Sequence, residues 1–138
     1  MFFKEFPLPK DPKFPEYSVN IRDFGAKEGA LATAAIKAAI ENASAQGGGH
    51  VIIPRGNWVT GQIHLLSNID LHFEEGAFVT FSKDPADYLP IVFTVYEGIR
   101  CYNYSPLIYA NKVENVAITG KGVLDGNGEA WWMWAKNL

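Results

Sequence analysis

The chain has 138 residues, which is enough for one domain or less. Its 12 lysines and arginines against 15 aspartates and glutamates give a net charge of -3, which removes the electrostatic reason to expect nucleic acid or an anionic membrane as a partner. A hydrophobic content of 48% with 20% charged residues excludes a disordered chain. The single cysteine, Cys101, excludes an internal disulfide. The sequence also has no run of about 20 apolar residues, which a membrane-spanning helix would need.

The first part of the chain, residues 1–18, is predicted to be an extended arm lying on another surface, and residues 19–138 to form the domain itself. Four prolines within the first sixteen residues forbid a regular helix in the arm. The opening residues, Met1 to Pro7, have no basic region followed by an apolar stretch, so they are not a secretory signal as they stand. A short strand is expected next, over Ser18–Arg22, before the glycine turn at Gly25.

One helix is predicted, over residues 32–46. Its apolar stripe recurs at helical spacing and is formed by Ala32, Ala35, Ile36, Ala39, Ile40 and Ala43. Gly47–Gly49 ends the helix because glycine accepts a positive φ. No Asn, Asp or Ser stands before it as a cap, since Lys27–Leu31 runs straight into the helix. The many alanines predict close packing against a neighbouring element.

Short strands are predicted for nearly all of the remaining chain. A first block comprises His50–Ile53, Asn57–Thr60, Gln62–Leu66, Asn68–Phe73 and Ala77–Phe81, and a second comprises Leu107–Ala110, Asn115–Thr119 and Gly122–Asp125. The turns between them lack the Asn-Gly or Asp-Gly pairs of tight hairpins. Strands this short, without hairpin turns, indicate the successive sides of a coil.

The two blocks resemble each other, because Ser67–Leu71 reappears as Glu114–Ile118. Asn68 and Asn115 begin the matching strands, and asparagine tolerates the left-handed conformation that a coil corner needs. The offset between these two asparagines predicts two stacked coils of roughly 20 to 25 residues each.

Several motifs in this order resemble the N-terminal portion of glycoside hydrolase family 28, the polygalacturonases and their pectin-degrading relatives. The matching segments are Asn20–Ala26, Gly47–Gly56, Thr60–Leu65, Ser67–Leu71, Gly120–Gly128 and Trp131–Trp132. The resemblance implies an all-β fold, a right-handed parallel β-helix that is incomplete here, with the helix of residues 32–46 capping its open end.

The resemblance also implies that the catalytic residues lie outside this chain. Family members hydrolyse their substrate with inversion through aspartates in Asn-x-Asp and Asp-Asp motifs, with Gly-His-Gly and Arg-x-Lys nearby. The chain contains no Asp-Asp, Gly-His-Gly or Arg-x-Lys. Asn68–Asp70 fits the pattern of the first motif, but it lies on an early coil, where a structural role is expected. We therefore expect no catalytic residue in this chain, which would be the first third or so of an enzyme.

Other candidates for chemistry have simpler explanations. Asp125 and Glu129 are the nearest pair of carboxylates, but they flank a turn in which Asp and Asn have conformational roles. The three histidines, His50, His64 and His72, have no cysteine partner and are expected at solvent-facing strand positions. No metal site and no cofactor are expected, and Cys101 is expected to be a buried or idle thiol.

Aromatic residues suggest a contact with sugar. Trp131, Trp132 and Trp134 follow a turn, and several tyrosines flank Cys101. Flat aromatic faces can stack on sugar rings, and an arginine can bind a uronate carboxylate with two hydrogen bonds. The substrate-binding candidates are Arg100, Tyr102 and Trp131. The alternative is that these aromatic side chains only pack on the outside of the coils.

The predicted function is therefore that of an N-terminal fragment of a hydrolase acting on pectic oligo- or polysaccharide, either galacturonan or rhamnogalacturonan. Its further partners would be the remaining coils of the same enzyme, or a partner chain, covering the open end from Leu124 onward. Secretion or a periplasmic location is expected. Two alternatives stay open: a non-catalytic glycan-binding β-helix module of tailspike or adhesin type, and a calcium-dependent pectate lyase.

Overall fold

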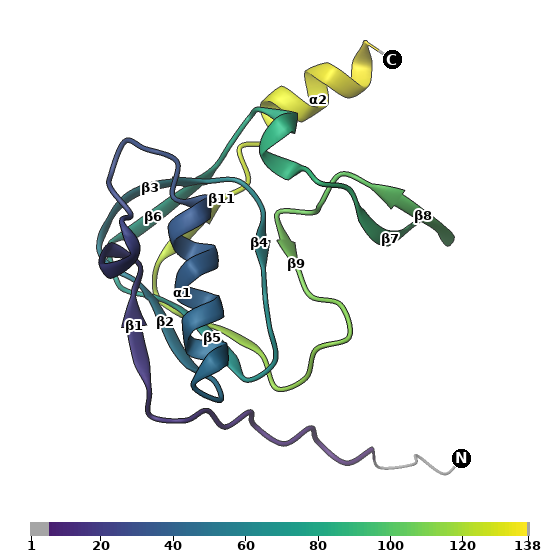
Figure 1. The fold of residues 1–138 in the computed structure, drawn as a ribbon. Helices are drawn as coiled ribbons and strands as arrows, with labels where there is room; N and C mark the ends of the chain where they lie inside the picture. Colours follow the sequence, from purple (N-terminus) through teal and green to yellow (C-terminus); the bar gives the residue numbers. More distant parts are fainter. Residues whose placement is uncertain (1–5, 138) are drawn as a thin grey trace.

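The computed structural model describes residues 6–137, in which short strands alternate with turns (Figure 1). The elements are β1 (Ser18–Asn20), α1 (Thr33–Ala45), β2 (Gly49–Ile53), β3 (Gly56–Thr60), β4 (Ile63–His64), β5 (Ile69–Phe73), β6 (Ala77–Phe81), β7 (Val92–Tyr96), β8 (Ile99–Asn103), β9 (Ile108–Tyr109), β10 (Ala117–Gly120), β11 (Val123–Asp125) and α2 (Glu129–Lys136). Within these residues, no helix is long and apolar enough to cross a membrane.

Strands of successive coils pair in parallel and in register. One sheet has the order β1-β2-β5-β10, a second has β11-β6-β3, and a third pairs β4 with β9. Two complete passes of the chain, β2-β3-β4 and β5-β6-β9, therefore each add one strand to each of three faces, which is how a parallel solenoid buries its core. The predicted strands of both blocks are confirmed, with ends that shift by a few residues.

The predicted spacing of the coils is wrong in one respect. His50 pairs with Asp70, so the first complete coil spans a sequence separation of 20. His72 pairs directly with Thr119, at a sequence separation of 47. The larger offset is therefore one coil, not two. That coil carries an insertion, because the chain leaves the stack after β6 and returns only at β9 (Figure 1).

The insertion contains an antiparallel hairpin, β7 and β8, which the sequence analysis missed. Its turn is Glu97-Gly98, and both residues have positive φ, 48° and 84°. Positive φ at both central residues is the geometry that matches the twist of paired strands. Such turns are usually recognised in a sequence by Asn-Gly or Asp-Gly, and Glu97-Gly98 is neither, so the sequence did not indicate a hairpin here. The hairpin projects from the stacked coils (Figure 1).

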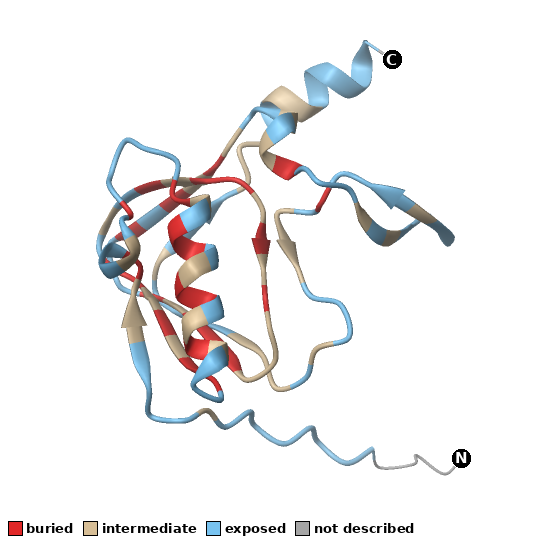
Figure 2. Ribbon diagram, in the orientation of Figure 1, coloured by how far each residue is buried: buried red, intermediate tan, exposed pale blue. Residues whose placement is uncertain are grey.

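Helix α1 is one residue shorter at each end than the predicted 32–46, with Ala32 and Gln46 as the flanking residues. No side chain caps its N-terminus, as its sequence indicated. Instead Thr33 ties the helix start to the coils, because its Oγ1 accepts a hydrogen bond of 2.7 Å from the backbone N–H of Gly61. The predicted alanine stripe is buried and joins the core formed by the inward-facing residues of the strands (Figure 2).

The first predicted strand is shorter than expected. It ends at Asn20 because the Asn20 side chain accepts a hydrogen bond from the backbone N–H of Arg22 and begins a 3-10 helix over Ile21–Phe24. Gly25, with φ of 94°, closes that turn. Before β1 the described arm, residues 6–17, has no regular secondary structure, in agreement with its prolines.

The last described coil is open on one side. Val51, Leu71 and Ile118 form one column of facing residues across the first sheet. Val51 and Leu71 are fully buried, whereas Ile118 is 47% exposed. Leu124 likewise stands above the buried Val79 and is partly exposed. The apolar core therefore reaches solvent at β10 and β11.

Candidate functional site

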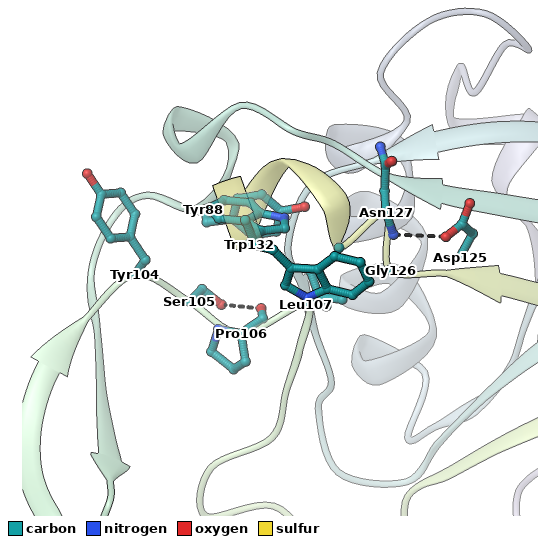
Figure 3. Close-up of a pocket in the computed structure, with 11 residues that line it drawn as sticks. Tyr88, Tyr104, Ser105, Pro106, Leu107, Asp125, Gly126, Asn127 and Trp132 are labelled. Carbon is teal, nitrogen blue, oxygen red and sulfur yellow. Dashed lines mark hydrogen bonds between the residues drawn. The ribbon is translucent and has the colours of Figure 1, made fainter. Parts of the chain in front are cut away.

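A cavity of about 710 Å³ lies where the last coil meets the insertion and α2. Its walls come from the end of a second 3-10 helix, Pro85–Tyr88, which precedes the hairpin, and from the segment that returns to β9 (Figure 3). The turn after β11 and the first turn of α2 complete them. The lining residues are Tyr88, Tyr104, Ser105, Pro106, Leu107, Asp125, Gly126, Asn127, Gly128, Trp131 and Trp132. Aromatic side chains thus dominate a hollow whose rim carries a carboxylate and an amide.

Tyr88 anchors the aromatic wall. Its side chain is buried, and its hydroxyl donates a hydrogen bond of 2.7 Å to the carbonyl of Ser82. Burial and, to a lesser degree, the charge of Asp87 raise the pKa of Tyr88 to about 12, so the phenol stays neutral. The Trp131 ring packs edge-on against it at 5.4 Å. A fixed aromatic pair therefore holds the start of α2 against the insertion.

The turn that precedes α2 shapes the opposite wall. The Asp125 carboxylate accepts a hydrogen bond of 2.8 Å from the backbone N–H of Asn127, and Asn127 has φ of 51°. The Asn127 side chain in turn donates to the carbonyl of Phe81. These contacts give Asp125 and Asn127 the conformational roles that the sequence indicated. Glu129 is exposed in the first turn of α2.

The cavity combines an exposed aromatic face with polar groups at its rim. The indole of Trp132 lies in its wall and is 67% exposed, which leaves a flat apolar face free for stacking (Figure 3). Tyr104 lines the same hollow. Hydroxyl-bearing ligands need both an apolar face and a few polar groups that fix orientation, and the rim at Asp125 and Asn127 supplies the polar groups.

The structure separates the three predicted substrate-binding residues. Trp131 lines the cavity, in the helix α2 that the sequence analysis did not predict. Arg100 and Tyr102 lie on β8, are exposed, and are not among the cavity's lining residues. The Tyr102 ring instead packs edge-on against Phe93 of the facing strand at 5.8 Å. Sequence reasoning also missed Tyr88, whose burial no local pattern signals.

The histidines were expected at solvent-facing strand positions. Instead, their side chains are partly buried and hydrogen-bonded to other residues of the coils. His50 Nδ1 lies 2.7 Å from the buried carboxylate of Asp70, and that carboxylate also accepts a hydrogen bond from Thr119 on the next coil. His72 contacts the same Thr119 hydroxyl at 2.8 Å. Asp70 therefore links three coils, which agrees with the structural role expected for Asn68–Asp70.

His64 sits closer to the cavity, and its Nε2 contacts the hydroxyl of Ser105 at 3.1 Å. Burial, helped by the positive charge of Lys37, lowers the pKa of His64. Across residues 6–137, no three His, Cys, Asp or Glu side chains come together as a metal site. Cys101, on β8, is a free and partly buried thiol.

Comparison with known proteins connects this geometry to one family. A hyperthermoactive exopolygalacturonase from Thermotoga maritima superimposes with a TM-score of 0.86 at 50% identity, covering 92% of this chain and 29% of that chain. The resemblance to glycoside hydrolase family 28 is confirmed. A family 28 exopolygalacturonase from Yersinia enterocolitica superimposes with a TM-score of 0.70 at 35% identity, covering 82% of this chain and 21% of that chain.

A curated relative agrees. An exo-poly-alpha-D-galacturonosidase of Dickeya chrysanthemi is 32% identical over 120 residues, which are 80% of this chain and 19% of the relative. No family model matches the chain. The chain thus spans less than a third of each of these three relatives. Since these relatives are exopolygalacturonases and an exo-poly-alpha-D-galacturonosidase, the comparisons favour the hydrolase interpretation over the tailspike or adhesin alternative.

Proposed function

We propose that this chain forms the N-terminal coils of an exo-acting hydrolase of galacturonan, whose catalytic carboxylates lie on coils outside it. The observation that carries the proposal is the fit to an exopolygalacturonase over nearly the whole chain at 50% identity. Inverting hydrolysis needs one carboxylic acid to protonate the leaving oxygen and a carboxylate, set further away, to activate water. Asp125 is committed to a turn and Asp70 to the stacking of coils, so neither is free for that work.

The finer fold in this proposal is a right-handed parallel β-helix with α1 as its cap. The support is the position of α1, whose apolar face is buried on the core while its other face is largely exposed (Figure 2). A helix there covers backbone and apolar surface that would otherwise offer an edge for aggregation. The open cross-section at Ile118 and Leu124 would be covered by the following coils of the same enzyme or by a partner chain.

The substrate contact in this proposal is the cavity beside α2. Trp131 builds its wall, Trp132 offers the stacking face, and Arg100 and Tyr102 would meet more distant sugar units along the projecting hairpin. Arginine supports this assignment because a guanidinium can bind a uronate carboxylate with two hydrogen bonds. We propose a secreted or periplasmic location, since the substrate is a polymer of cell walls.

The mass and the activity of the isolated protein test the proposal together. The denatured mass should be several times the 15.3 kDa of residues 1–138. The protein should release reducing sugar from polygalacturonate as small products from the start. It should keep that activity in a calcium chelator and form no product that absorbs in the ultraviolet, which separates hydrolysis from lyase action. Residues 1–138 alone should be inactive. Full activity of this chain alone would contradict the proposal.

Trp132 provides the matched test of the sugar contact. In the isolated protein, Trp132→Ala should raise KM by about tenfold with little change in folding, because stacking on an aromatic ring contributes on the order of 1 kcal/mol or more. Met133→Ala is the control, since Met133 is the next residue of α2, is also exposed, and does not line the cavity. Equal kinetics for the two variants would remove Trp132 from the substrate site.

A further inference from the structure

The proline-rich arm is fastened to coils that are far from it in the sequence. The Asn115 side chain donates a hydrogen bond of 2.7 Å to the carbonyl of Lys13, and its oxygen accepts one of 3.3 Å from the backbone N–H of Lys13. Phe14 packs edge-on against His50 of β2, and the Tyr17 hydroxyl donates to Asn42 of α1. The arm therefore has a defined position along residues 13–17.

These contacts give the arm a direction. At Tyr17 the arm lies level with β2, since the Tyr17 carbonyl accepts from the backbone N–H of His50. At Lys13 it has reached Asn115, at the corner that opens into β10. The sheet order is β1-β2-β5-β10, so the arm climbs the stack from its first coil to its last described one (Figure 1). The climb from β2 to β10 covers two strand spacings of about 4.8 Å each. Proline-rich chain rises about 3.1 Å per residue, so residues 13–17 are long enough for it.

The part of the arm that lies beyond Asn115 has no surface beneath it among the described residues. Phe6 is 82% exposed and Leu8 is 90% exposed. Residues 6–12, extended at about 3.1 Å per residue, would reach roughly 20 Å further, the height of about four more coils. The matched region is 29% of the Thermotoga maritima exopolygalacturonase and 19% of the Dickeya chrysanthemi relative, so most of each relative lies outside it.

We infer that residues 6–12 are a strap that binds the outer corner of the coils stacked above β10. This inference rests on the proposed function, which supplies those coils. The chemistry of the strap follows from its one described anchor. Prolines at 7, 9 and 12 remove backbone donors, so the strap cannot pair as a strand, and its carbonyls accept hydrogen bonds from side-chain amides as Lys13 does from Asn115.

The corner that receives the strap is built as a ladder. The Asn115 side chain also donates to the Asn68 side chain of the coil below, at 3.1 Å. Both asparagines have positive φ, 65° at Asn68 and 55° at Asn115. A further coil that continued this corner would present the next amide to the strap at the same spacing. Phe6 and Leu8 would cover apolar side chains beside it.

Trypsin cleavage after Lys10 tests the strap in the protein as isolated from its source. The reference is a synthetic peptide of residues 6–16, and the denatured mass is measured in the same digest. Two hydrogen bonds of ordinary strength would slow the cleavage by about 30-fold relative to the peptide. Asn115→Gly removes the described anchor while keeping the positive φ. Lys112→Gly is its control, because Lys112 also has φ of 55°.

Slow cleavage after Lys10 that persists in Asn115→Gly and is lost in Leu8→Asp supports the strap. Cleavage as fast as in the peptide, with a mass well above 15.3 kDa, overturns the strap and leaves the proposed function standing. Protection that disappears in Asn115→Gly also overturns it, because the described anchor then explains everything. A mass of 15.3 kDa overturns the proposed function and removes the strap's partner with it.

Discussion

The burial gradient along one column of core residues gives a quantitative prediction. Leu71 and Ile118 face each other on neighbouring strands, but Leu71 is fully buried and Ile118 is 47% exposed. Truncating a buried leucine to alanine costs about 3 kcal/mol, from lost burial and the cavity left behind. The Ile118 side chain is only about half buried, and its truncation would open onto solvent and create no closed cavity. Ile118→Ala should therefore lower the free energy of unfolding of residues 1–138 by about 1 kcal/mol.

Urea unfolding of residues 1–138 in dilute solution, followed by far-ultraviolet circular dichroism, measures the difference. With a typical slope of about 2 kcal/mol per molar urea, the two midpoints should differ by about 1 M. In a longer protein whose next coil covers β10, Ile118→Ala should become as costly as Leu71→Ala. Equal midpoint shifts of the two variants in residues 1–138 would refute the reasoning, because they would mean that the last described coil is already covered or that the column does not exist.

Two further predictions concern backbone space and pH. Gly120→Ala should destabilise the chain by at least about 2 kcal/mol more than Gly25→Ala in urea unfolding. Both glycines have φ near +95°, but only at Gly120 would a Cβ collide with the carbonyl of Phe73. The lowered pKa of His64 favours its neutral form in the fold. Its stabilising contribution is therefore present above pH 6.5 and lost as the pH falls, and His64→Gln should flatten that dependence of the urea midpoint.

The regular parts of this fold could be predicted because their signals are local. The alanine stripe placed α1 to within a residue at each end, since helical period and a glycine stop act over a few turns. The short strands were found for the same reason. The two asparagines marked the corners correctly, because a positive φ is a property of one residue.

The insertion could not be predicted because its signals depend on distant packing. The segment from residue 82 to residue 106 has no local sequence pattern that marks an insertion. The offset between Asn68 and Asn115 was therefore interpreted as two coils of ordinary length. Helix α2 was missed for a similar reason. Three tryptophans in a short segment suggest a surface, and the contact of Trp131 with Tyr88 joins residues far apart in the chain.

The candidate site and the open end of the stack are one region of the molecule. The cavity wall at Asp125–Gly128 directly follows β11, the last described strand, and α2 continues from it. The same chain segment that exposes Leu124 therefore shapes the hollow beside Trp132. A further coil stacked on β11 would bury the exposed core residues Ile118 and Leu124. The same coil would also form part of the cavity wall and so determine the depth of the cavity. Under the proposed function, sugar binding would therefore depend on the completion of the solenoid, and residues 1–138 should bind oligogalacturonate more weakly, by calorimetry, than a longer protein that carries the next coil.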